Sequence, residues 1–157
     1  PTAMRCASLS RAAPTGNPMP VSYRLVPSRN LIVVTFSGVV GLAETLAGAR
    51  EVTQAPTYRA HMNHLVDLRP VTGWERDFPG FLALQAHLAD VFAWHRTGAM
   101  VVGIAPHSVA REMSGMVLRS WSGVEGPVLR IATEEDQALA MLGLRERSLD
   151  AVHAEAG

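Results

Sequence analysis

The sequence predicts an α/β domain with a mixed five-stranded sheet, because short apolar segments alternate with amphipathic helical segments along the chain. Two apolar runs, 21–26 and 31–36, flank a Pro-Ser-Arg-Asn turn and predict an opening β-hairpin. After this hairpin, helices and strands alternate, which requires parallel strands joined by right-handed crossovers. The predicted order is therefore β-β-α-β-α-β-α-β-α, with about four helices and only the first strand antiparallel.

Each element in the first half has its own local signal. Apolar residues at intervals of three or four predict a helix over 42–55, which Pro56 ends. The next strand begins at His64 and stops at Pro70, and we expect a loop over 70–78. Asp77 is placed to cap a long helix that Thr97 and Gly98 end, with Pro79 in its first turn.

The second half continues the alternation. The apolar run 100–105 predicts a strand covered on both faces, and Ser108 is expected to cap the helix that follows it. The run 128–132 predicts the fifth strand. A Thr-Glu-Glu-Asp motif at 133–136 resembles a capping box for the last helix, and Gly143 is expected to end that helix.

The predicted domain covers residues 21–144. Residues 1–20 are rich in Ser, Ala and Pro, and we expect them to form a flexible N-terminal arm. Residues 145–157 are expected to form a C-terminal tail with helical character. No apolar run approaches the roughly 18 residues that a membrane-spanning helix needs. Cys6 is the single cysteine, so we expect no disulfide framework and a cytoplasmic location.

Composition removes several classes of function. The 157 residues carry a formal net charge of zero, so the overall charge favours neither nucleic acid nor an anionic membrane. All 14 basic residues are arginine, so these residues contain no P-loop lysine and no lysine to form a Schiff base. We expect no cofactor.

Five features together resemble a known family. They are the hairpin 23–36 followed by Gly38, the Leu-Val-Asp-Leu-Arg strand end at 65–69, the Met-Ser-Gly-Met run at 113–116, the Leu-Arg-Ile run at 129–131 and the Gln-to-Gly segment 137–143. In this order they resemble the STAS-like domains of anti-sigma-factor antagonists, which are related to Sec14-type lipid carriers. The resemblance covers about residues 21–144. It implies a non-catalytic regulatory or protein-interaction module, of the kind found in small bacterial STAS-like proteins of unresolved function.

The sequence departs from that family at one place. The antagonists carry a phosphorylatable serine in the turn that opens the helix after the third strand. Here the stretch 72–80 contains no serine, and its only hydroxyl, that of Thr72, lies before the helix. A phosphate on Thr72 would lose much of the stabilisation that a helix N-terminus provides. We therefore do not extend the phosphorylation switch to this chain.

Two groups of polar residues near the third strand are candidates for a metal site or for acid/base chemistry. His61 and His64, with Asp67 nearby, have the residue types of a metal pair, but a strand beginning at His64 would separate the two imidazoles. We therefore expect no metal site. Asp67 and Arg69 alternate along the strand and point to the same face, which favours a structural ion pair over acid/base chemistry.

Aromatic and methionine side chains form the candidate binding site. At helical spacing such residues usually pack in a core. If the long helix stands off the sheet, they would instead line a pocket for a small apolar ligand or lipid between it and the helix starting at Ser108. The same surface could bind a protein partner or a second copy of the chain, giving a homodimer. The candidate ligand- or partner-binding residues are Arg69, Thr72, Trp74, Phe78, Phe81, Met113 and Trp121.

Catalytic motifs are not evident. The sequence lacks a Gly-x-Ser-x-Gly elbow, a Gly-x-Gly-x-x-Gly loop and a His-Glu-x-x-His helix. His107 and Ser108 open a helix beside a strand end, but capping explains Ser108 without any catalytic role. We expect no enzymatic activity and no catalytic residue.

Overall fold

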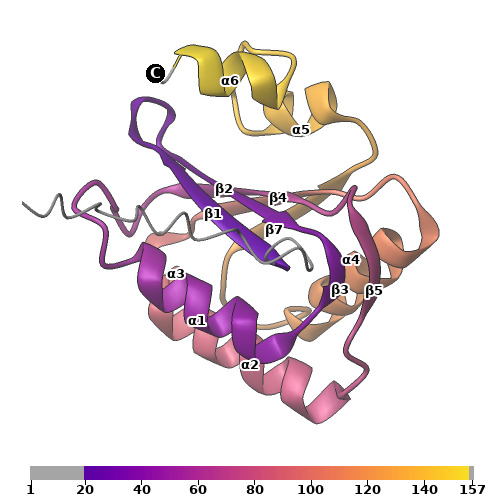
Figure 1. Ribbon diagram of the computed structural model, residues 1–157. Helices are drawn as coiled ribbons and strands as arrows, with labels where there is room; N and C mark the ends of the chain where they lie inside the picture. The colour runs from indigo at the N-terminus through magenta and orange to yellow at the C-terminus, as the bar shows by residue number, and fades with distance from the viewer. Residues whose placement is uncertain (1–19, 156–157) are drawn as a thin grey trace, which may run out of the picture.

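The computed structural model describes residues 20–155, and a five-stranded sheet forms the centre of this part of the chain (Figure 1). Its strand order is β1-β2-β4-β6-β7. The first two strands are antiparallel, with Val21 opposite Phe36, and the other three pairs are parallel. The predicted mixed sheet is confirmed. Its strands are β1 (Val21–Val26), β2 (Leu31–Phe36), β4 (Asn63–Asp67), β6 (Met100–Ile104) and β7 (Val128–Ala132).

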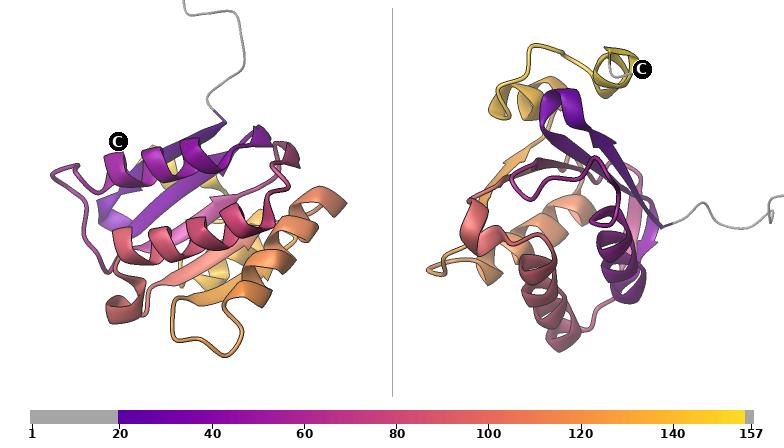
Figure 2. Two further views of the ribbon diagram at one scale, coloured as in Figure 1. Left: turned by 90° about the horizontal axis from the view of Figure 1, so that it is seen from below. Right: turned by 90° about the vertical axis from the view of Figure 1, so that its left-hand side faces the viewer.

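Helices cover both faces of this sheet (Figures 1 and 2). Four of them lie on one face: α1 (Leu42–Val52), α2 (Phe78–Val91), the single-turn α3 (Trp94–Thr97) and α4 (Ser108–Ser120). The other face is covered by two short helices from the end of the chain, α5 (Glu135–Met141) and α6 (Leu149–Glu155). We call these the four-helix face and the two-helix face.

The alternation of side chains along each strand divides the core between the two faces. Leu31 and Val33 of β2 pack with α5 and α6, whereas Ile32 and Val34 face the opposite helices. The central strand β4 divides in the same way, with Leu65 on the two-helix face and Val66 on the four-helix face. The sheet is thus covered on both sides, as its nearly continuous apolar strands predict.

A second, two-stranded sheet lies where the sequence predicted a loop. β3 (Gly38–Val40) and β5 (Val71–Trp74) pair in parallel, with Val40 opposite Trp74. The loop prediction over 70–78 is therefore wrong in its first half. The segment is only four residues long and contains Thr72 and Gly73, so its sequence has the composition of a turn, and its pairing partner lies about thirty residues earlier.

Helix ends differ from the prediction at two places. α1 ends at Val52 rather than at residue 55. The long helix is also not continuous, because α2 ends at Val91 and Ala93 adopts a left-handed conformation with φ of 53° before α3 begins. α3 then ends at Gly98, as predicted.

One of the three predicted helix N-caps is confirmed. Asp77 caps α2 by accepting a hydrogen bond from the Gly80 backbone N–H at 3.0 Å, which confirms the prediction. The predicted Ser108 cap is wrong, since His107 Nδ1 accepts from the Ala110 N–H of α4. The predicted capping box is wrong as well, because Glu134 occupies the N-cap of α5 without a side-chain hydrogen bond to the helix.

The predicted N-terminal arm, including Cys6, lies outside the described residues except for Pro20. Within the predicted C-terminal tail, α6 buries Leu149 and Val152 against the two-helix face. Between residues 20 and 155, no helix is both long enough and apolar enough to cross a membrane.

Candidate functional site

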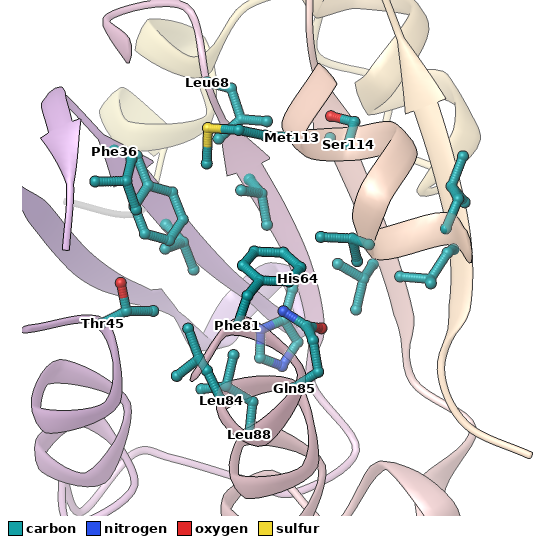
Figure 3. A pocket seen from close by; sticks show the side chains of 18 of the residues that line it. Phe36, Thr45, His64, Leu68, Phe81, Leu84, Gln85, Leu88, Met113 and Ser114 are labelled. Atoms are coloured by element: carbon teal, nitrogen blue, oxygen red, sulfur yellow. The ribbon is translucent and has the colours of Figure 1, made fainter. Parts of the chain in front are cut away.

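An apolar cavity of about 140 Å³ lies between the four-helix face of the sheet and helices α1, α2 and α4 (Figure 3). The strands contribute one wall, which includes Val34, Val66 and Val101. Trp74 of β5 and the helices contribute the others. The helix side chains on the lining are Leu42 and Thr45 of α1, Phe81, Leu84, Gln85 and Leu88 of α2, Trp94 of α3, and Met113, Ser114, Val117 and Leu118 of α4.

Gly103 helps to leave this space open. It occupies the middle of β6, between Val102 and Ile104, whose side chains pack on the two-helix face. A side chain at position 103 would therefore project towards the cavity. A Cβ atom built there would lie 3.8 Å from Ser114 Oγ, which is an ordinary contact distance. Space for a side chain exists at Gly103 and is left unused.

Two buried polar side chains and two tryptophans, one buried and one half-buried, form a linked group at the cavity. Trp94 Nε1 donates to His64 Nε2 at 3.4 Å, and Trp121 Nε1 donates to Gln85 Oε1 at 3.1 Å. The Trp94 and Trp121 rings meet edge to face, with centroids 6.1 Å apart. We call His64, Gln85, Trp94 and Trp121 the indole-linked cluster. Its His64 and Gln85 side chains both line the cavity, from β4 and α2 (Figure 3).

Burial fixes the charge state of His64. Its side chain is 3% exposed and lies edge-on to Phe92, with ring centroids 4.5 Å apart. Removal from water disfavours the imidazolium and lowers the pKa of His64 to about 3. The imidazole is therefore neutral at physiological pH, in agreement with its acceptance of the Trp94 N–H.

Two other polar side chains on the lining are satisfied by the protein itself. Tyr23 donates its hydroxyl to the Thr45 carbonyl at 2.8 Å, and Thr45 donates its own hydroxyl to the Gly41 carbonyl at 2.7 Å. Burial raises the pKa of Tyr23 well above its ordinary value, so the phenol stays protonated. The Tyr23 hydrogen bond attaches α1 to β1, and the Thr45 hydroxyl bonds within the first turn of α1.

The structure brings three of the predicted site residues to the cavity. Trp74, Phe81 and Met113 all line it. Phe78 lies outside, 54% exposed, with its ring edge-on to Trp74 at a centroid distance of 5.8 Å. Trp121 is not on the lining, but it donates a hydrogen bond to Gln85, which is.

The remaining two predicted site residues lie elsewhere. Thr72 is exposed on β5. Arg69 forms a bidentate ion pair with Asp67, with Nε–Oδ1 and Nη2–Oδ2 distances of 2.9 Å, and a further bond from Nη1 to Glu135 of α5. The predicted Asp67–Arg69 pair is confirmed. It ties the end of β4 to the two-helix face rather than to the cavity.

His61, His64 and His107, which the sequence singled out, lie in different environments. His61 is exposed and His64 is buried, and within residues 20–155 no three His, Cys, Asp or Glu residues gather as metal ligands would. His107 accepts from Ala110 through Nδ1, and its Nε2 lies 3.1 Å from the Arg69 carbonyl oxygen. Both ring nitrogens of His107 are thus engaged in holding the start of α4.

Sequence reasoning missed three residues of the site: Gln85, Gly103, and His64 in its role on the cavity. Gly103 had a usable signal, because an isolated glycine inside an apolar strand often marks missing side-chain volume. Gln85 had a weaker one, as a polar residue among the apolar positions of α2. Neither signal alone shows which face of the sheet contains the space.

Comparison with known proteins adds one finding about the fold. No protein-family model matches the sequence, and no curated protein matches it. Among solved structures, the chain is similar to the anti-sigma factor antagonist SpoIIAA in its unphosphorylated form. The two share 10% sequence identity with a TM-score of 0.49, over 78% of this chain and 97% of that chain. The likeness concerns the fold, and the antagonist role belongs to that protein.

Proposed function

We propose that this domain binds a small apolar molecule in the cavity and acts as a non-catalytic sensor or carrier of it. The observation that supports this proposal is the cavity itself, an apolar space of about 140 Å³ beside a tightly packed second core. Apolar cavities of roughly 150 Å³ stay dry and accept guests such as benzene or xenon. An empty space of this size lowers stability, so a bound molecule would regain contacts that the protein lacks.

The size of the cavity limits the ligand. Pockets for drug-sized molecules range from roughly 300 to 1,000 Å³, which is well above the 140 Å³ found here. A whole lipid would not fit without rearrangement of the helices. The proposal therefore narrows the expected small apolar ligand or lipid to a guest of about one six-membered ring.

The state of the titratable lining groups supports binding without chemistry. His64 is held neutral by burial, and Tyr23 is held protonated and bonded to a backbone carbonyl. A general acid or base works best when its pKa lies near the working pH, and neither group meets that condition. The lining offers shape and apolar contact.

Ligand-dependent stability tests the proposal. We expect benzene at ten times its dissociation constant to raise the free energy of unfolding by about 1.4 kcal/mol through linkage. Gly103→Val, which fills the space beside Ser114, should abolish that increase, and circular dichroism would verify that the variant folds. Val39→Ala changes an exposed strand residue outside the cavity and should respond as the wild type does. Equal responses in Gly103→Val and wild type would contradict the proposal.

A second candidate function is protein interaction, with self-association as the simplest case. It is favoured by Phe78 and Leu82, which are 54% and 57% exposed and lie four residues apart on the first turns of α2. Residues at this spacing share one face of a helix. If this face forms a dimer, Leu82→Glu should convert the dimer to a monomer in sedimentation velocity experiments. A wild-type chain that is monomeric at all concentrations would contradict self-association.

A further inference from the structure

The hydrogen bonds of the indole-linked cluster determine which groups His64 and Gln85 present to the cavity. An indole N–H can only donate, so His64 Nε2 and Gln85 Oε1 must both act as acceptors. A neutral imidazole that accepts at Nε2 carries its proton on Nδ1. The Gln85 amide, oriented by its oxygen, retains two N–H donors. The two tryptophans thus leave N–H donors available on both side chains, together with the second lone pair of Gln85 Oε1.

Among residues 20–155, none of these N–H donors has a hydrogen-bond acceptor. Across residues 20–155, the side-chain hydrogen bonds of His64 and Gln85 are the two received from Trp94 and Trp121. Both side chains are buried, at 3% and 8% exposure, and both line the cavity. Neither donor nitrogen is among the fully enclosed donors without a partner, so each keeps some accessible surface, and a ligand that supplies an acceptor can reach it and satisfy it.

The rest of the lining limits what charge the ligand can have. Among the described residues on the lining, Arg130 alone carries a formal charge; this residue is exposed, and its guanidinium donates to the Leu129 carbonyl. A buried carboxylate or ammonium would therefore lack a charged partner in the cavity, which is strongly unfavourable. The ligand must be neutral.

We propose that the cavity recognises a small neutral carbonyl compound, a ketone or aldehyde of about one ring in size, whose oxygen accepts from His64 Nδ1 and Gln85 Nε2. A carbonyl oxygen has two lone pairs and can accept both donors, while the apolar remainder contacts Val66, Leu84 and Phe81. The inference rests on the proposed function and adds the chemical class of the ligand. In it, Trp94 and Trp121 are positioning residues that orient the two donors.

A matched pair of ligands separates this inference from the proposed function. Cyclohexanone and methylenecyclohexane have nearly the same shape and differ in having C=O or C=CH₂ at one position. The measured quantity is the ratio of their dissociation constants, obtained by titration calorimetry for each protein. In Gln85→Met we expect the relative preference for cyclohexanone to fall about tenfold from the wild-type value, the effect of one lost hydrogen bond.

Val39→Ala, at an exposed strand residue outside the cavity, is the control variant and should leave the ratio unchanged. Trp74 Nε1 is a third donor without a partner among the described residues, on a different wall of the same cavity, and Trp74→Phe tests it as a competing donor. If Gln85→Met fails to fold, His64→Phe removes the second donor and should lower the ratio by a similar factor.

Each other outcome has a definite meaning. An unchanged ratio in Gln85→Met, with both compounds still bound, would overturn the carbonyl assignment and leave the proposed function standing. A fall in the ratio in Trp74→Phe alone would overturn the assignment to His64 and Gln85. Binding of neither compound by the wild type, together with no response to benzene, would overturn the proposed function and this inference with it.

Discussion

The two faces of the central sheet use the same strands but contain different cores. The two-helix face is aliphatic, with Leu31, Leu65 and Val102 essentially inaccessible and packed against Leu139 and Val152 of α5 and α6. The four-helix face contains the aromatic residues, the buried His64 and Gln85, and the cavity. One face is filled and the other is left open.

Side-chain shape explains the difference. Leucine, valine and isoleucine interdigitate in regular layers, and α5 and α6 are short enough to follow the sheet closely. On the opposite face, the large rings of Phe92 and Trp94 stack with centroids 5.5 Å apart, and Gly103 contributes no side chain to fill the space there. We therefore expect stability to be concentrated on the two-helix face, and we propose that ligand recognition takes place on the four-helix face.

Truncation of one leucine on each face should produce the largest effect. Leu65→Ala removes a fully buried side chain from the filled core, and we expect it to lower the free energy of unfolding by 2–5 kcal/mol, about the range for such substitutions. Leu84→Ala should cost clearly less, because Leu84 already borders empty space and has fewer contacts to lose. Urea denaturation of both variants measures the difference. Equal losses would contradict the contrast between the faces.

Acid should destabilise the four-helix face through His64. Its pKa is about 3 in the folded protein, below the ordinary value near 6.5, so the unfolded chain binds the proton more readily. The stability that depends on a neutral His64 is therefore complete above pH 6.5 and is lost as the pH falls towards 3. At pH 4.5 the loss would be about 3 kcal/mol. A plot of the free energy of unfolding against pH should show this loss in the wild type and not in His64→Phe.

Removal of one indole N–H should have a moderate effect. Trp121→Phe keeps most of the ring packing against Trp94 but leaves Gln85 Oε1 without its donor. We expect a loss of about 1–3 kcal/mol, the cost of a buried polar group left unpaired. Val128→Ala, at an exposed position of β7, is a control that should lose less. Thermal denaturation compares the two, and a neutral Trp121→Phe would show that the cluster contributes no stability.

The smallest effect should be a gain. Gly103→Ala adds one methyl group to the cavity at an ordinary contact distance and reduces the freedom of the unfolded chain. We expect stability to rise by about 0.4–1 kcal/mol while benzene affinity falls. Urea denaturation with and without benzene measures both quantities. A destabilised variant would show that the space beside Ser114 is already filled.

The sequence predicted the sheet more completely than the site, and the reason is physical. Strands such as β2 and β6 are marked by local runs of apolar residues, and each helix by its own spacing. β5 escaped prediction because four residues with a central Thr-Gly pair carry little local signal. The ion pair of Asp67 and Arg69 was predictable because the two residues are only two positions apart.

The cavity could not be predicted in the same way. It is the space that remains after side chains from several distant segments have packed, and no single segment encodes it. The sequence did indicate Trp74, Phe81 and Met113 from their residue types. It gave no indication that Arg69 faces the two-helix side or that Trp121 acts through Gln85, because both facts depend on which face each element packs against.

The most direct test of the open four-helix face is a crystal structure determined under xenon pressure. The expected result is a xenon atom in the cavity bounded by Val66, Leu84, Gly103 and Met113, with none bound among the aliphatic residues of the two-helix face. A structure without xenon at that position, in which these side chains meet and fill the space, would contradict the account.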